Sequence, residues 1–199
     1  ADCLRSILRQ APDVIMVGEM RDSETAQIAI QAALTGHLVF STVHTNSAPA
    51  TVTRLIDMGI EPFLVSSTII GILSQRLVRR ICPDCRTAYE AHPEELRELG
   101  INHTSSEPIK LFKGTGCGNC RETGYRGRIE VHELLIINDR VKNVIMTNSD
   151  SQAIKQKAVV EGMKTLKMDG TDKALKGFTT AEEVLTVTYE DESEGFSFS

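Results

Sequence analysis

The sequence DVIMVGEMRDSETAQIAIQAALTGHLVFSTVH, residues 13 to 44, decides the fold class of this chain. Two short apolar runs, residues 13–17 and 37–43, are typical of buried strands. Between them, apolar residues recur at helical spacing after a possible helix N-cap at Asp22 or Ser23. A strand, a helix and a strand in this order predict a right-handed crossover in which the two strands are parallel. The chain is therefore predicted to be an α/β protein.

Helical spacing of apolar residues continues along much of the remaining chain. We expect helices over about 48–58, 62–80, 93–99, 139–147, 151–161, 163–176 and 180–187. The segment GYRGRIEVHELLIIN predicts a turn followed by a strand. From Tyr189 the chain is acidic and rich in serine and glycine, which is typical of a disordered tail.

Composition and charge exclude some classes of function. Hydrophobic residues make up 41% and charged residues 25% of the chain, as in an ordinary soluble globular protein. The net charge is −5, and four of the acidic residues lie in the last ten positions, which hold no Lys or Arg. The longest apolar segment, FLVSSTIIGIL, is too short for a membrane span. We therefore expect no general surface for nucleic acid or membrane, and five cysteines without a secretory signal indicate a reducing compartment.

Polar side chains follow both predicted strands at their carboxyl ends. Glu19 comes after the first strand, and Thr42 and His44 lie at the end of the second. Because parallel strands end at the same edge of a sheet, we expect these residues to meet there. A carboxylate so placed can hold Mg²⁺ or orient a water in phosphoryl transfer, and an imidazole can donate a hydrogen bond to a phosphate. The alternative is an exposed acid that pairs with Arg21, while His37 lies at the other end of the second strand.

A nucleotide hydrolase of this kind also needs a phosphate-binding loop. The motif G-x-x-x-x-G-K-[ST], whose backbone and Lys hold the phosphates, does not occur in the 199 residues. The first ten residues, ADCLRSILRQ, begin without Met and are typical of the middle of an amphipathic helix. We therefore expect the chain to carry only part of an ATP site and its N-terminus to be a cut.

Two cysteine pairs predict a metal site. The pairs are CPDC and CGNC, which contain Cys82, Cys85, Cys117 and Cys120. Two C-x₂-C turns can bring four thiolates to one tetrahedral site, and in a reducing compartment this pattern favours structural Zn²⁺. The alternatives are redox dithiols or buried thiols, and His92 or His103 could replace one ligand.

Several longer segments resemble one family, the type II secretion and type IV pilus assembly ATPases. LRSILRQAPDVIMVGEMRD resembles the Walker B segment of these proteins, and TGHLVFSTVHTNSA resembles their histidine box. RLVRRICPDC and GCGNCRETGYRGRIEVHELL are similar to their tetracysteine zinc region, and GFTTAEEVLTVT is similar to their closing helix. The resemblance covers about residues 1 to 188 and favours the secretion ATPase of the protein E type.

The resemblance implies roles for the polar residues at the strand ends. Members are cytoplasmic hexameric ATPases of the RecA-like motor class, which work with an inner-membrane platform protein and a cytoplasmic adaptor to assemble pseudopilin or pilin filaments. Glu19 matches the Walker B glutamate that arranges Mg²⁺ and the attacking water. His44 and His37 match residues of the histidine box, with His44 as the phosphate sensor, and Thr42 and Arg21 are expected near the bound ATP. The four paired cysteines match the family's zinc ligands.

The resemblance also implies a division of the chain. The expected parts are the C-terminal part of a RecA-like core (1–81), a tetracysteine zinc-binding region (82–132), a helical C-terminal subdomain (133–188) and a disordered acidic tail (189–199). The family's phosphate loop lies upstream of the Walker B segment, so we expect no ATP turnover by this chain alone. A pilus extension ATPase is the close alternative to a secretion ATPase, whereas the retraction ATPase resembles the chain only through the histidine box.

An alternative of another class is a zinc-ribbon module that binds nucleic acid or protein. Seven arginines near the cysteine pairs could form a basic face: Arg76, Arg79, Arg80, Arg86, Arg121, Arg126 and Arg128. The acidic total charge favours subunit contacts or solvation for these side chains, so we expect no nucleic-acid partner.

Overall fold

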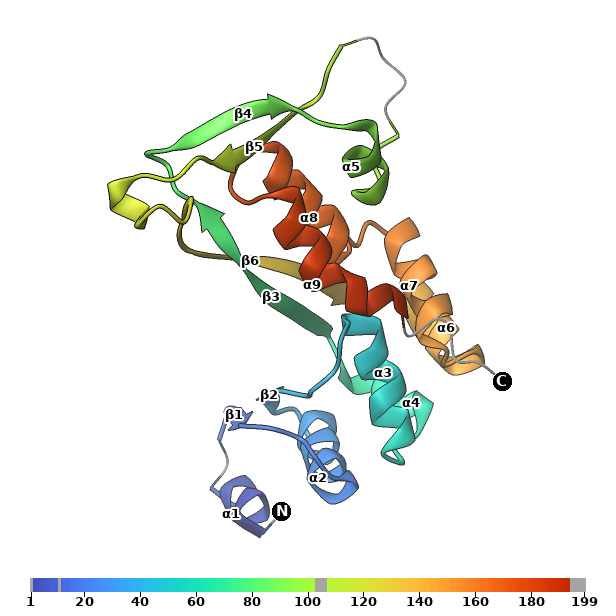
Figure 1. The fold of residues 1–199 in the computed structure, drawn as a ribbon. Coiled ribbons are helices and arrows are strands. Elements are labelled where there is room, and N and C mark those ends of the chain that lie inside the picture. The colour runs from blue at the N-terminus through green and yellow to red at the C-terminus, as the bar shows by residue number, and fades with distance from the viewer. Residues whose placement is uncertain (1, 11, 103–106, 194–199) are drawn as a thin grey trace. The chain divides into compact units, whose positions relative to one another are not determined.

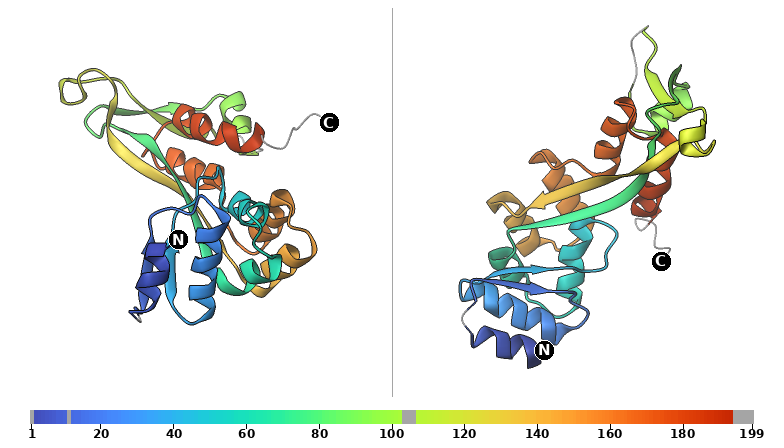
Figure 2. Two further views of the ribbon diagram at one scale, coloured as in Figure 1. Left: turned by 90° about the horizontal axis from the view of Figure 1, so that it is seen from below. Right: turned by 90° about the vertical axis from the view of Figure 1, so that its left-hand side faces the viewer.

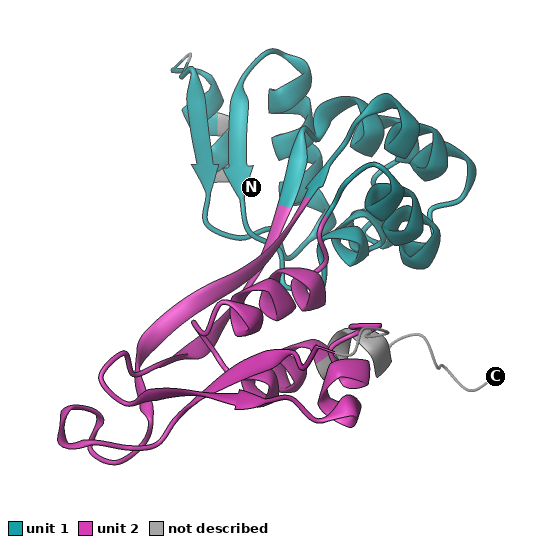
Figure 3. Ribbon diagram, turned by 90° about the horizontal axis from the view of Figure 1, so that it is seen from above, with its two compact units in different colours: residues 1–72, 135–163 teal, residues 73–134, 164–199 magenta. Residues whose placement is uncertain are grey.

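The fold is that of a computed structural model, which describes residues 2–10, 12–102 and 107–193 (Figure 1). The chain divides into two compact units, each made of two chain segments (Figure 3). The first unit comprises Ala1–Ile72 and Leu135–Met163, and the second comprises Leu73–Leu134 and Lys164–Ser199. In the described part of the chain, no helix is long and apolar enough to cross a membrane.

The first unit contains the segment that decides the fold class. Its elements are α1 (Asp2–Leu8), β1 (Val14–Val17), α2 (Ser23–Leu34), β2 (Leu38–Ser41), α3 (Ala48–Asp57), α4 (Pro62–Thr68), α6 (Asp139–Thr147) and α7 (Ser151–Val160). The two strands are parallel, in a register that pairs Val14 with Leu38 and Val17 with Ser41. The helix between them begins after the predicted N-cap Asp22. The predicted strand–helix–strand crossover is therefore confirmed.

One face of the β1–β2 sheet is covered by α1 and by the crossover helix α2. α1 and α2 lie on the same side of the sheet (Figure 2), where Ile15 packs in a small core with Leu4, Ile28 and Ala32. Because alternate strand residues point to opposite faces, the other face is also apolar. Its four large side chains are exposed: Val14, Met16, Leu38 and Phe40. We call these four residues the exposed apolar face.

A larger core joins the remaining helices of the first unit. Its fully buried members include Val52, Leu55, Val65, Leu135, Val141, Ile145 and Ile154. Short polar side chains cap and connect the helices around this core. Ser47 caps α3 by accepting a hydrogen bond from the Ala50 N–H. The hydroxyl of Thr53, within α3, donates to the Ser149 carbonyl oxygen at 2.9 Å and ties α3 to the turn before α7.

The second unit holds both cysteine pairs. Its elements are β3 (Gly71–Ile81), β4 (Arg86–Glu90), α5 (Pro93–Glu98), β5 (Lys110–Gly114), the 3₁₀ turn η1 (Gly118–Cys120), β6 (Tyr125–Ile136), α8 (Leu166–Leu175) and α9 (Ala181–Ser193). β3 pairs with β6, and the chain passes between the units within these two strands. β4 and β5 form an antiparallel pair that holds a small core with α8 and α9, built around Leu111, Ala174 and Val184.

The helix predicted over 62–80 is wrong in its second half. α4 ends at Thr68, and β3 begins at Gly71. From Ile72 to Val78 the burial alternates with a period of two. Ser74 and Val78 are buried and Ile72 and Arg76 are half-buried, whereas the residues between them are exposed. The partner strand β6 lies some fifty residues further along the chain, so local helical spacing could not reveal this pairing.

Most other predicted elements occur near their expected positions. The helices predicted over 48–58, 139–147 and 151–161 correspond to α3, α6 and α7. α9 continues to Ser193, beyond the predicted end at 187, while residues 194–199 of the predicted tail lie outside the described part of the chain. The β4–β5 pair between the cysteine pairs was not predicted, because its five-residue strands carry charged residues at their ends.

Candidate functional site

Glu19 lies at the carboxyl edge of the β1–β2 sheet. β1 ends at Val17 and β2 ends at Ser41, and these two residues are paired in the parallel register. Glu19 therefore follows β1 at the edge where His44 follows β2. The predicted meeting of polar residues at this edge is confirmed, because the Glu19 and His44 side chains are in contact.

Two cationic or polar side chains engage the Glu19 carboxylate. The Arg21 Nε lies 2.6 Å from Glu19 Oε2, and the His44 Nε2 lies 3.0 Å from Glu19 Oε1. The Glu19 side chain is 20% exposed, whereas Arg21 is 77% and His44 is 85% exposed. An ionised carboxylate only accepts hydrogen bonds, so His44 donates through Nε2. The arrangement is a fixed acceptor beside two exposed donors that can turn toward an anionic ligand.

Thr42 bonds to the backbone on both sides of Glu19. Its hydroxyl donates to the Gly18 carbonyl oxygen at 2.6 Å. Its own carbonyl oxygen accepts a hydrogen bond from the Met20 N–H at 3.0 Å. The prediction that Thr42 lies near bound ATP stays a prediction.

His37 does not join the group around Glu19. It precedes β2, whereas Thr42 and His44 follow it. The Nδ1 atom of His37 lies 3.0 Å from the Ala32 carbonyl oxygen and 3.1 Å from the Thr35 hydroxyl. His37 therefore closes the end of α2, at the opposite end of β2 from the predicted site.

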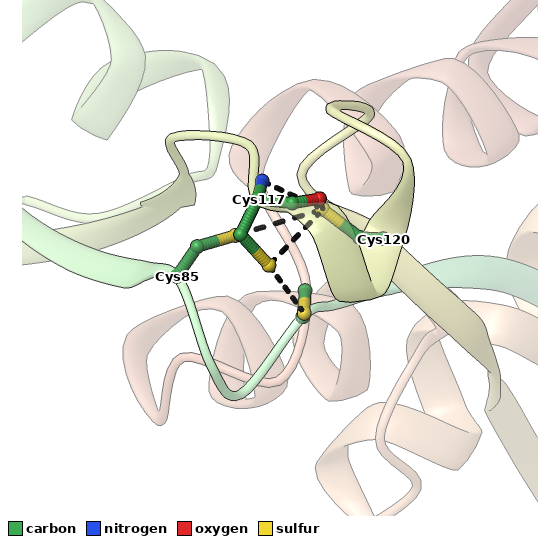
Figure 4. A group of neighbouring side chains, drawn as sticks. Cys85, Cys117 and Cys120 are labelled. Atoms are coloured by element: carbon green, nitrogen blue, oxygen red, sulfur yellow. Dashed lines mark hydrogen bonds between the residues drawn. The ribbon is translucent and has the colours of Figure 1, made fainter.

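The four paired cysteines come together in the second unit (Figure 4). Their four sulfur atoms all lie within 4.8 Å of one another. The Sγ–Sγ distances are 3.9 Å for Cys82 and Cys117, 3.8 Å for Cys85 and Cys120, and 3.7 Å for Cys117 and Cys120. These distances exceed a disulfide bond of about 2 Å, so the four thiols are free. The cluster could hold a metal ion.

The surroundings of the sulfurs favour the thiolate form of Cys120 over that of Cys85. Burial raises the pKa of the Cys85 thiol to about 12. Burial also acts to raise the pKa of Cys120, but the N–H groups of Cys117 and Gly124 donate to its sulfur and lower that pKa to about 7. Backbone donors directed at a sulfur stabilise its anionic form, which is the form that binds metal.

Gly114, at the end of β5, and Gly124, just before β6, allow these two segments to approach closely beside the cysteine cluster. A Cβ added to Gly114 would lie 2.0 Å from the Gly124 carbonyl oxygen. That same oxygen accepts a hydrogen bond from the Cys82 N–H at 2.9 Å.

Sequence reasoning missed a further link between the pairs, in which Asn119 donates to Asp84 at 2.9 Å. Each of these two residues lies inside a C-x₂-C turn, and this position was the available signal.

The histidines considered as substitute ligands do not belong to the described cluster. His92 precedes α5 as its N-cap, and its N–H donates to the Glu95 carboxylate at 3.0 Å. His103 lies outside the described residues. The described cluster consists of the four cysteines.

Comparison with known proteins identifies relatives along almost the whole chain. The model of the family described as Type II/IV secretion system protein matches residues 1–186. The chain is 53% identical to the type IV pilus assembly ATPase PilB of Thermus thermophilus over 190 residues, 96% of this chain and 21% of that protein. It is also 53% identical to the type II secretion system ATPase E of Vibrio cholerae over 187 residues, 94% of this chain and 37% of that protein.

A solved structure supports the same fold. The pilus retraction motor PilT with bound ADP aligns with a TM-score of 0.66 and 29% identity, over 98% of this chain and 46% of that one. The predicted α/β class with a tetracysteine region is thus confirmed. The expectation that a retraction ATPase resembles this chain only through the histidine box is wrong, since the likeness extends along the chain. The chain spans less than half the length of each of these three proteins.

Proposed function

Because this chain belongs to the family of type II/IV secretion system proteins, we propose that it forms the C-terminal part of a motor ATPase that assembles pseudopilin filaments in type II secretion. A type IV pilus assembly ATPase is the second candidate, which the equal identity of 53% to such a protein favours. Family membership along residues 1–186 supports the motor over a separate zinc-ribbon module.

The single observation that carries this proposal is the Glu19 carboxylate at the carboxyl edge of the sheet, with His44 and Arg21 in contact with it. Glu19 fits the role of an acceptor that orients the attacking water and helps to hold Mg²⁺. His44 fits the role of a donor to a phosphate oxygen, and Arg21 holds the carboxylate in place. When bound, Mg²⁺ neutralises charge on the ATP phosphates. His37, at the other end of β2, contacts the end of α2 and not the group around Glu19.

Hydrolysis by this site needs residues from outside the 199-residue chain. The chain contains no G-x-x-x-x-G-K-[ST] motif, so the groups that cradle the β- and γ-phosphates must come from elsewhere in the longer protein. We propose that the longer protein is a cytoplasmic homohexamer, held at the inner membrane through a platform protein and a cytoplasmic adaptor. We propose no nucleic-acid partner.

ATP hydrolysis by the longer protein tests the proposed function. The longer protein is expected to release phosphate from ATP in the presence of Mg²⁺ and to stop when EDTA removes the metal. The 199-residue chain alone is expected to release none above background. A longer protein that binds no ATP, or turnover by the isolated chain, would contradict the proposal.

We propose that the metal of the cysteine cluster is Zn²⁺ in a structural role. A tetrahedral zinc ion with Zn–S bonds of about 2.3 Å places its four sulfurs about 3.8 Å apart. Three of the Sγ pairs lie at 3.7, 3.8 and 3.9 Å, and all four sulfurs lie within 4.8 Å of one another. With four thiolates as ligands no coordination position remains for a substrate, so the site joins the two C-x₂-C turns and does not take part in hydrolysis.

A further inference from the structure

We propose that Thr42 is a positioning residue for Glu19, and this inference rests on the proposed ATPase function. Both neighbours of Glu19 are bonded to Thr42. The Gly18 carbonyl oxygen accepts from the Thr42 hydroxyl at 2.6 Å, and the Met20 N–H donates to the Thr42 carbonyl oxygen at 3.0 Å. Thr42, which directly follows β2, thus holds the backbone immediately before and after Glu19.

The position of these two bonds explains why a hydroxyl is needed there. The paired register of the two strands ends at Val17 and Ser41, so the regular ladder does not hold the chain at Glu19. The bond from Met20 uses only the backbone of Thr42 and survives any substitution. The bond to Gly18 uses the side chain, and it is the one that a substitution at Thr42 can remove.

Gly18 itself does not fix the position of Glu19. A Cβ added to Gly18 would meet no described atom within 4 Å, and Gly18 is absent from the residues with positive φ. The backbone there is therefore free of both steric confinement and an enforced left-handed turn. The Thr42 hydroxyl supplies the restraint, and a displacement of about 1 Å at a reacting group can lower a rate by about 100-fold.

The inference differs measurably from a direct contact between Thr42 and nucleotide. If Thr42 acts through Glu19, its loss should lower kcat and leave nucleotide affinity nearly unchanged. If Thr42 instead binds the nucleotide, its loss should weaken nucleotide affinity and raise KM. The conservative change to Ser keeps the hydroxyl and should restore most of the rate.

The test compares Thr42→Val, Thr42→Ser and Thr53→Val in the longer protein. Thr53 is the matched control, because its hydroxyl also donates to a backbone carbonyl in the first unit but takes no part in the group around Glu19. Thr42→Val is expected to lower kcat about 10- to 100-fold with nucleotide affinity within about twofold of wild type. Thr42→Ser should return kcat to within about threefold of wild type, and Thr53→Val should leave it unchanged.

A double-mutant cycle with Glu19→Gln separates positioning from a general structural effect. Adding Thr42→Val to Glu19→Gln should lower the residual single-turnover rate no further, because the group being positioned is already disabled. The inference would be overturned if Thr42→Val lowered the rate of Glu19→Gln by as much as it lowers the wild-type rate, or if Thr42→Val alone kept the wild-type kcat. In either case turnover by the wild-type protein would still support the ATPase. Absence of hydrolysis by the wild-type longer protein would overturn the proposed function together with the inference.

Discussion

The position of Glu19 follows from a few atoms of its neighbours. The strand before it is apolar and buried at Ile15, so β1 is fixed in the first unit. Thr42 holds the backbone around Glu19, and Arg21 and His44 hold its two carboxylate oxygens. The sequence predicted that Glu19, Thr42 and His44 would meet, since parallel strands end at one edge. It could not predict which atoms touch, because side chains beyond a strand end follow no periodic rule.

At the residue scale, the geometry of the four cysteines predicts the metal content of the chain. Chain purified without chelator is expected to contain about one zinc per chain by metal analysis. Because zinc binds thiolates, acidification should protonate the sulfurs and release it. Cys117→Ser should bind zinc more weakly than wild type. Chain that lacks zinc and carries both pairs as disulfides would contradict the structural site.

The elements α3 and β3 show where local sequence pattern predicts secondary structure correctly and where it fails. α3 was predicted correctly because Pro49 in its first turn and Gly59, with a positive φ just after its end, mark both ends of the helix locally. β3 was predicted as helix because its partner β6 is distant in the chain. Local signals therefore predict elements that are stabilised locally, and they fail for a strand that depends on long-range pairing.

At the element scale, an ion pair links α9 to β3. Glu183 of α9 accepts from the Arg79 side chain through Nε at 2.9 Å and Nη2 at 2.6 Å, and from the Arg79 N–H at 2.7 Å. The Arg79 guanidinium also lies over the Tyr125 ring, 4.1 Å from its centroid. Glu183→Gln should therefore destabilise the chain by about 1–3 kcal/mol in thermal or denaturant unfolding. Glu182→Gln, an exposed neighbour in the same turn, is the control and should have little effect.

The same pair gives the pH dependence of stability a definite sign. Burial acts to raise the pKa of Glu183, but the hydrogen bonds and charge of Arg79 outweigh it and lower that pKa below its ordinary 4.5. The stabilisation is therefore present above about pH 4.5 and is lost as the pH falls through the lowered folded pKa. The stability difference between wild type and Glu183→Gln should shrink in acid. A difference that stays constant from pH 7 to pH 3 would contradict this assignment.

At the scale of the whole molecule, the chain matches only part of the length of its relatives. The α/β class, the cysteine cluster and the family could all be predicted, because each rests on motifs that are short and continuous in sequence. The division into two units that each use two chain segments could not, since contacts between distant segments decide it. The boundaries expected at residues 81, 132 and 188 stay predictions. Because contiguous apolar side chains are usually packed against other parts of a protein, we expect the exposed apolar face to be covered in the longer protein.

We propose that this chain contributes the hydrolytic carboxylate of an ATPase, with His44 and Arg21 beside it, and that the phosphate-binding loop of the site lies elsewhere in the longer protein. The most direct measurement is ATP turnover and nucleotide affinity of the longer protein with Glu19→Gln. Glu61→Gln is the matched control, because Glu61 is exposed and its side chain makes no capping hydrogen bond. Glu19→Gln is expected to lower kcat by at least about 100-fold while nucleotide affinity stays within about threefold of wild type. Turnover by Glu19→Gln equal to that of Glu61→Gln would contradict the claim.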